Sequence, residues 1–370
     1  QKNTVKEECA LRKERYRRYL IRLFFGSVIF TAFFSWWYLA ERTGVEASSG
    51  QSVSAAVGLP NRVYAGGMPV GIYLETDGVL VVGTGSVMDI SGEERTPSGG
   101  CLQPGDYILA VNGHSVTDKE EIVQMVKENE CQPVALTIRR GEKMEKVEVE
   151  PVQTAEMEYR LGLWIRDDTQ GIGTVTYITE NGQFAALGHG ISDPDTGKRI
   201  ESTGGDLYLA QIHSIVRGTA RQPGSLCGSI PYQSREPVGE ISANCASGIY
   251  GRIEEDQKGT FFAQKSVEVA AADEVHTGEA VIRSAVTGEC RDYSIQILEL
   301  DPENENSKNL VLEVTDPELI ELTGGIVQGM SGSPLLQDGK IIGAVTHVFV
   351  NDSEKGYGIF IENMMAQNQG

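Results

Sequence analysis

A run of 18 residues without a charged side chain, residues 23–40, constrains this chain more than any other feature. As an α-helix it would be about 27 Å long, close to the thickness of the hydrocarbon core of a bilayer. Four arginines lie in the eight residues before it, and Trp36-Trp37-Tyr38 lies near its end. Basic residues stay in the cytoplasm and aromatic rings prefer the membrane interface. We therefore predict a transmembrane anchor at 23–40, with residues 1–22 as a basic cytoplasmic tail and the rest of the chain exported.

A cleaved signal peptide is the alternative for this segment, because Val45-Glu46-Ala47 loosely resembles a small-x-small cleavage site. The apolar core of a secretory signal is usually about 7–15 residues long. The longer run therefore favours a retained anchor.

The charge distribution separates the basic tail from an acidic body. The chain has 52 acidic and 32 basic residues, a net charge of −20, whereas residues 1–22 alone carry +5. A body that is so acidic repels phosphate backbones, which excludes nucleic acid as a main partner. The six cysteines show no C-x-x-C or zinc-binding spacing, and we expect neither a metal nor another cofactor.

A β-rich module is predicted after a small, polar linker at 41–61. Short alternating runs surround one helix whose start has capping-box spacing, with Thr117 followed by Glu120. Segment 102–113, LQPGDYILAVNG, resembles the strand-and-turn signature of PDZ domains. The resemblance implies a PDZ domain at 62–153.

The carboxylate-binding loop of such a domain would fall at Val70, Gly71 and Ile72. A glycine-containing turn exposes backbone N–H groups to a C-terminal carboxylate, and the bound peptide then adds a strand to the edge of the sheet. The alternative is an intramolecular spacer that docks on the next domain.

Residues 154–370 hold many short strands with glycine-rich turns, which predicts a β-barrel or a β-sandwich. In Gly329-Met330-Ser331-Gly332-Ser333-Pro334 the glycines permit a tight turn that projects a serine hydroxyl and gathers N–H groups, as an oxyanion hole requires. His189 ends an apolar run and is flanked by glycines, and Asp316 follows a predicted strand. A histidine can take the hydroxyl proton, and a buried carboxylate fixes its tautomer.

Asp316 also fits a second role, because it precedes a proline and can cap the segment 317–322. It lies only 15 residues before Ser331, and Asp206 or Asp256 can compete with it as the orienting carboxylate.

The chain order His, Asp, Ser is that of trypsin-like peptidases. Segments 340–346 and 356–360 resemble the strands that run beside the substrate pocket in those double β-barrels. The predicted substrate-binding residues are Asn244, Thr346 and His347.

The whole arrangement resembles the stage IV sporulation protein B family of serine peptidases from endospore-forming bacteria. The basic N-terminus, the anchor, the PDZ module and the motifs AALGHG, TDP and GMSGSP carry the resemblance, together with segment 239–251, GEISANCASGIYG. It implies a mostly β protein with a trypsin-like double-barrel peptidase domain. It also implies a catalytic triad of His189, Asp316 and Ser331, with an oxyanion hole formed by the N–H groups of Gly329 and Ser331.

This resemblance further implies an endopeptidase that is exported from the forespore into the space between the forespore and mother-cell membranes. It would cleave itself and a membrane-anchored regulator, whose cleavage releases an intramembrane protease that processes a mother-cell sigma factor. One alternative is a catalytically silent, anchored PDZ scaffold that binds peptide or membrane-protein termini. Cysteine chemistry through Cys227 or Cys245 is less favoured, because neither has a basic neighbour in the sequence.

Overall fold

The computed structural model describes residues 60–232, 235–262, 265–304 and 306–367. The predicted cytoplasmic tail, the anchor at 23–40 and almost all of the linker lie outside these residues. In the described ranges, no helix has both the length and the apolar character that a transmembrane span requires.

Six strands close into a first antiparallel barrel, in the order β2-β11-β12-β17-β16-β13 and back to β2. Alternate side chains point inward along each strand, so that Ile72, Phe184 and Leu207 are fully buried in one apolar core. The strands are β2 (Pro69–Thr84), β11 (Leu163–Ile178), β12 (Gln183–Ala186), β13 (Ser202–Leu209), β16 (Gly239–Cys245) and β17 (Gly248–Ile253).

A second barrel repeats the same pairing order, β19-β20-β21-β24-β23-β22 and back to β19. Leu310, Leu312 and Val314 alternate inward along one of its strands. The strands are β19 (Gly278–Ser284), β20 (Arg291–Leu300), β21 (Leu310–Val314), β22 (Pro334–Gln337), β23 (Lys340–Phe349) and β24 (Asp352–Phe360).

Two short strands and a helix join the barrels. Strand β1 (Arg62–Ala65) pairs with β11 of the first barrel and with β18 (Val267–Val269), which pairs with β23 of the second. The helix α5 (Ile361–Gln367) buries Met364 in an apolar cluster that takes side chains from both barrels. A site built from loops of the two barrels therefore has a fixed geometry.

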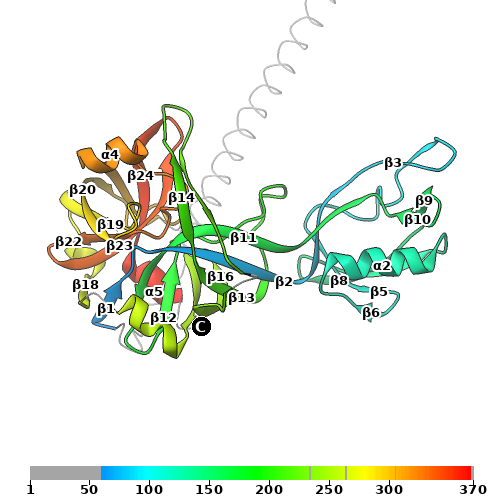
Figure 1. Cartoon of the computed structure of the whole chain (residues 1–370), viewed down its shortest axis with the longest axis horizontal. Coiled ribbons are helices and arrows are strands. Elements are labelled where there is room, and N and C mark those ends of the chain that lie inside the picture. Colours follow the sequence, from blue (N-terminus) through cyan, green and yellow to red (C-terminus); the bar gives the residue numbers. More distant parts are fainter. Residues whose placement is uncertain (1–59, 233–234, 263–264, 305, 368–370) are drawn as a thin grey trace, which may run out of the picture. The chain divides into compact units, whose positions relative to one another are not determined.

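The PDZ domain is inserted into the β2–β11 hairpin of the first barrel. These two 16-residue strands can be followed from one domain into the other in Figure 1. Val79 and Leu80 of β2 pair with β5 of the PDZ domain, whereas the start of the same strand pairs with β13 of the barrel. The inserted elements are β3 (Val87–Met88), β4 (Glu94–Arg95), β5 (Asp106–Val111), β6 (His114–Ser115), α2 (Lys119–Asn129), β7 (Val134–Arg140), β8 (Lys143–Val149), β9 (Val152–Ala155) and β10 (Glu158–Arg160).

This insertion changes the boundaries that we predicted for the PDZ domain, residues 62 and 153. Strand β1 and the start of β2, up to Thr76, belong to the barrels, and the PDZ core extends to Ile165 in β11. The capping prediction shifts by one residue: Asp118 caps α2 and accepts from the N–H of Glu121 at 2.8 Å.

The remaining described elements lie in the connections between barrel strands. They are β14 (Gln211–Val216), β15 (Ser225–Ser229), α3 (Lys258–Phe261), α4 (Pro317–Thr323) and two 3₁₀ turns, Glu255–Gln257 and Ala272–Glu274.

The five cysteines of the described part are all free thiols.

Candidate active site

The loop that carries Ser331 is pinned to the first barrel through its carbonyl groups. Thr174 Oγ1 donates to the carbonyl oxygen of Gly329 at 2.8 Å, and the Thr174 N–H donates to that of Ser331 at 2.9 Å. Thr176 Oγ1 donates to the carbonyl oxygen of Gly332 at 2.8 Å. Strand β11 thus binds carbonyl groups of this loop and makes no hydrogen bond to its N–H groups.

Gly332 is required by both conformation and space. Its φ is +93°, and a Cβ there would lie 2.1 Å from the carbonyl oxygen of Thr174 and 2.4 Å from the nitrogen of Leu187. Met330 is fully buried and anchors the loop in the core of the second barrel. The side chain between them, Ser331, is left only partly buried.

The N–H groups of residues 329–332 form two pairs, one hydrogen-bonded and one free. The N–H groups of Met330 and Gly332 donate to the carbonyl oxygens of Val327 and Val345, at 3.0 and 2.8 Å. The N–H groups of Gly329 and Ser331 have no hydrogen-bond acceptor among the described residues. Free backbone donors close in sequence to a serine hydroxyl are what an oxyanion hole requires.

His189 is presented by a tight turn after β12, in which Leu187 and Gly188 have φ near +70°. Its Nδ1 lies 3.0 Å from the carbonyl oxygen of Gly190. A carbonyl oxygen only accepts, so Nδ1 carries the proton and Nε2 keeps a free lone pair. Burial lowers the pKa of His189, although the hydrogen bond to Gly190 opposes this shift. The ring is therefore a neutral base near pH 7.

The serine hydroxyl does not face this base in the structure. Ser331 Oγ donates to the carbonyl oxygen of Thr346 at 2.8 Å, and within the described chain no hydrogen bond joins it to His189. In this structure the hydroxyl proton is therefore directed to Thr346 and not to the imidazole.

Asp316 lies at the start of α4 and caps it, as in the second of its two predicted roles. Its Oδ1 accepts from the N–H groups of Glu318 and Leu319 at 3.0 and 3.2 Å, and its Oδ2 accepts from that of Ser294 at 3.2 Å. No hydrogen bond of the described residues joins this carboxylate to His189. The structure therefore does not bring the predicted orienting carboxylate to the base: Oδ1 caps α4, and Oδ2 is bound to the backbone of β20.

The two competing carboxylates are also engaged elsewhere. Asp206 Oδ2 accepts from the hydroxyl of Tyr208 at 3.1 Å, and Asp256 Oδ2 accepts from the side-chain amide of Gln257 at 3.1 Å. Neither makes a hydrogen bond to His189 within the described chain.

The three predicted substrate-binding residues have different surroundings. Thr346 is buried and its Oγ1 donates to the carbonyl oxygen of Ser307, and the amide of Asn244 is bound entirely to backbone groups. These hydrogen bonds give both side chains structural roles, and substrate binding by them stays a prediction. The ring of His347 lies 4.8 Å from that of His189, centroid to centroid. Desolvation, with the charges of His189 and Lys308, lowers the pKa of His347 to about 4.

The predicted carboxylate loop at Val70, Gly71 and Ile72 is wrong. These residues lie in β2 and pair with β11 on one side and β13 on the other, and Val70 and Ile72 are fully buried in the first barrel. Their strand is continuous, so it offers no turn of exposed N–H groups.

The PDZ groove lies between α2 and the start of β11 instead. A cavity of about 480 Å³ is lined there by Val123 of the helix, by Trp164 of the strand and by the turn before it. In that turn the N–H groups of Leu161 and Gly162 have no acceptor among the described residues. The sequence motif that marks this turn is Leu161-Gly162-Leu163, an apolar-glycine-apolar segment directly before a strand, which the prediction at 70–72 missed.

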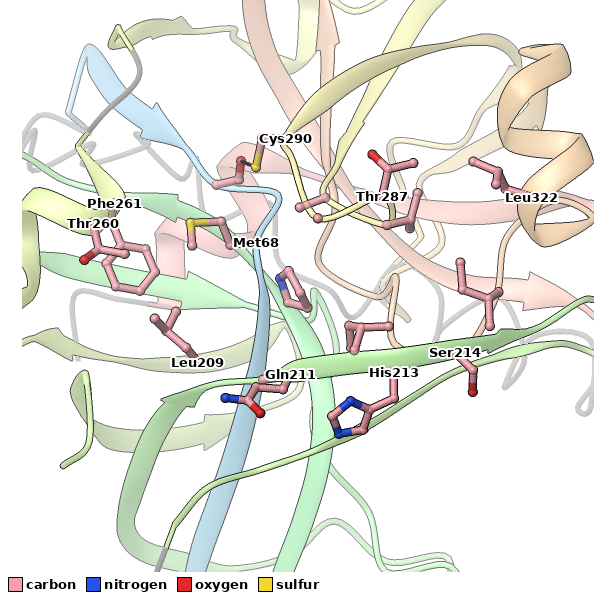
Figure 2. Close-up of a pocket in the computed structure, with 18 of the residues that line it drawn as sticks. Met68, Leu209, Gln211, His213, Ser214, Thr260, Phe261, Thr287, Cys290 and Leu322 are labelled. Carbon is pink, nitrogen blue, oxygen red and sulfur yellow. Dashed lines mark hydrogen bonds between the residues drawn. The ribbon is translucent and has the colours of Figure 1, made fainter. Parts of the chain in front are cut away.

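A larger cavity of about 880 Å³ is separate from the predicted catalytic residues, none of which lines it. Figure 2 shows that Gln211, His213 and Ser214 of β14 lie along it, with Met68 and Cys290 nearby. In the part of the chain that the structure covers, no three His, Cys, Asp or Glu side chains are grouped as metal ligands.

Two closed six-stranded barrels, with a glycine-framed serine loop from one and a neutral histidine from the other, define a trypsin-like peptidase that carries a PDZ insertion. Residues 157–365 match the family described as SpoIVB peptidase S55, and residues 95–140 match a PDZ domain. The first match spans more than half of the 370 residues. The chain therefore belongs to the SpoIVB peptidase family and is a serine endopeptidase.

Solved structures are similar to parts of the chain. The active form of the Rv3671c protease from M. tuberculosis is 13% identical, with 54% of this chain and 73% of that chain covered and a TM-score of 0.32. The HtrA-type protease AlgW with a decapeptide is 11% identical, with 62% and 54% covered and a TM-score of 0.32. The PDZ domain of the SdrC-like protein from Listeria monocytogenes is 21% identical, with 24% and 87% covered and a TM-score of 0.20. The comparison with curated proteins gave no match.

Proposed function

We propose that this peptidase cuts polypeptides through an acyl-enzyme on Ser331, with His189 as the general base. The observation that supports this most directly is the pair of free N–H groups, on Gly329 and on Ser331 itself, beside a hydroxyl that the loop projects. Three carbonyl groups of that loop, those of residues 329, 331 and 332, accept hydrogen bonds from Thr174 and Thr176, so that the donors are fixed before substrate binds.

In the proposed reaction Ser331 Oγ attacks the scissile carbonyl carbon while Nε2 of His189 takes the hydroxyl proton. The carbonyl oxygen becomes an oxyanion held by the two free N–H groups. The imidazolium then gives its proton to the leaving amine as the C–N bond breaks, which leaves an acyl-enzyme. Water, deprotonated by the same nitrogen, hydrolyses the ester and restores the serine.

The biological setting and the substrates of the peptidase are proposed from the family resemblance. The chain is proposed to act in sporulation, held by an anchor at residues 23–40 with its folded domains exported to the space between the forespore and mother-cell membranes. It is proposed to cleave itself and a membrane-anchored regulator of an intramembrane protease. The motifs that carry the family resemblance, and the match over residues 157–365, support this assignment.

The experiment is labelling of the full chain with a fluorophosphonate probe. Labelling is expected in the wild type and is lost in Ser331→Ala. Ser333→Ala is the matched control: this serine lies two residues away and is fully buried, and its hydroxyl has no hydrogen-bond partner among the described residues, so its loss leaves labelling unchanged. Labelling that persists in Ser331→Ala would contradict the assignment. A folded wild type that is never labelled would favour the silent scaffold.

The PDZ groove is proposed to bind an extended peptide through its free C-terminus. Val123→Glu places a charge in the apolar groove, and we expect the dissociation constant of a peptide with an apolar C-terminal residue to rise about tenfold. Val350→Glu is the control, because the two valines are 62% and 63% exposed. Calorimetry measures both, with the amidated peptide as a second control. Equal affinity of Val123→Glu and the wild type would place the peptide elsewhere.

A further inference from the structure

A single peptide group holds His189 in place. The carbonyl oxygen of Gly190 accepts from His189 Nδ1 at 3.0 Å, and the N–H of Ile191, in the same peptide group, donates to Asn244 Oδ1 at 2.9 Å. A continuous hydrogen-bonded chain therefore runs from the side-chain amide of Asn244 through one backbone amide to the imidazole. In such a chain each hydrogen bond polarises the next.

Asn244 also closes the loop that follows His189. Its Nδ2 donates to the carbonyl oxygens of Ile191 and Ile200, each at 2.9 Å, and these two residues bond to each other through backbone groups at 3.0 Å. The amide thus uses one acceptor and both donors. A carboxylate has no donor and an aliphatic side chain has neither, so only an amide makes all three bonds.

Backbone groups of the turn after β16 contact Gly190. The Gly190 N–H donates to the carbonyl oxygen of Ala246 at 3.2 Å, and a Cβ at this glycine would lie 2.5 Å from the carbonyl oxygen of Cys245. The turn that packs here, Cys245-Ala246-Ser247, contains no acidic residue. Within the described chain, no Asp or Glu makes a hydrogen bond to His189.

We propose that Asn244 is the positioning residue for His189 and acts through the Gly190–Ile191 peptide group, in the place where an orienting carboxylate would stand. This inference rests on the proposed function, in which His189 is the base. The peptide group fixes the Nδ1–H tautomer and the orientation of the ring, which is the main task of the third member of a triad. The carbonyl oxygen offers a partial rather than a full negative charge to the imidazolium.

The experiment compares Asn244→Ala with Asp316→Asn in the full chain, by the rate constant of fluorophosphonate labelling and by the tautomer of His189. The tautomer is read from ¹⁵N chemical shifts of the histidine rings, and His189→Gln assigns its signal among the five histidines. Asn244→Ala is expected to lower the labelling rate about 10–100-fold, because a general base that is no longer held in place reacts more slowly, and to weaken the preference for Nδ1–H. Asp316→Asn is expected to keep the tautomer and a labelling rate within about threefold, because an asparagine still caps α4.

A loss of about four decades in Asp316→Asn, with a changed tautomer, would restore Asp316 and overturn the inference. An unchanged tautomer in Asn244→Ala would overturn it as well. If Asn244→Ala does not fold, Asn244→Asp replaces it: its oxygen still accepts from Ile191, so the Nδ1–H tautomer must persist. Failure of the proposed function is a separate result, because persistent labelling in Ser331→Ala tests the nucleophile and the tautomer does not depend on Ser331.

Discussion

The two barrels supply the two reacting groups through loops that are stabilised in different ways. The turn of the serine loop in the second barrel is set by its own glycines, and its carbonyl groups also accept hydrogen bonds from Thr174 and Thr176 of the first barrel. The histidine loop of the first barrel is fixed by a side chain 55 residues away, because the amide of Asn244 bonds to both of its ends. A turn with steric requirements leaves a sequence motif, whereas a clamp by one distant amide does not.

The largest effect on the loop that carries Ser331 is expected from Gly332→Ala. A Cβ would lie 2.1 Å from the carbonyl oxygen of Thr174, at a φ of +93°, so we expect labelling of Ser331 to be lost and the free energy of unfolding to fall by about 2–4 kcal/mol. Gly339→Ala is the control, because its φ is +79° but nothing lies within 4 Å. That variant should lose about 1 kcal/mol and keep full labelling. Urea denaturation and labelling measure both, and equal effects would mean that space is not what Gly332 provides.

Thr174→Val tests the threonine that connects this loop to the first barrel. The substitution removes the bond from Oγ1 to the carbonyl oxygen of Gly329 and keeps the shape of the side chain. We expect the labelling rate to fall about 10–100-fold, because the N–H of Gly329 is one of the proposed oxyanion donors and its misplacement weakens that donor.

Thr169→Val is the matched control for this measurement. Thr169 lies on the same strand, and its buried hydroxyl has no hydrogen-bond partner in the described part of the chain. A valine there should leave the labelling rate unchanged. If both variants were equally slow, the effect would belong to β11 in general and not to the contact with Gly329.

The sequence predicted the fold class and both loops, because alternating runs and glycine turns are local signals. It did not predict the insertion of the PDZ domain, since the insertion is defined by the change of pairing partner along β2, from β13 of the barrel to β5 of the PDZ domain, which is not a local signal. It also left Asp316 with two roles, and only the contacts at α4 separate them. The clamp by Asn244 joins residues 53 positions apart, which no local pattern reports.

The smallest effect that we expect concerns the pH at which His189 becomes protonated and the labelling rate falls. Burial lowers the pKa of His189, so the neutral base persists below pH 6.5, and the labelling rate should fall only as the pH drops through that lowered value. His347 covers the ring at 4.8 Å, and His347→Ala admits water and should move the acid limb up toward the ordinary value. His347→Gln keeps much of the bulk, and it leaves the limb in place because His347, with a pKa of about 4, is neutral there. Labelling rates measured from about pH 4.5 to 8 separate these cases. Identical limbs for the two variants would mean that the His347 ring does not set the pKa of the base.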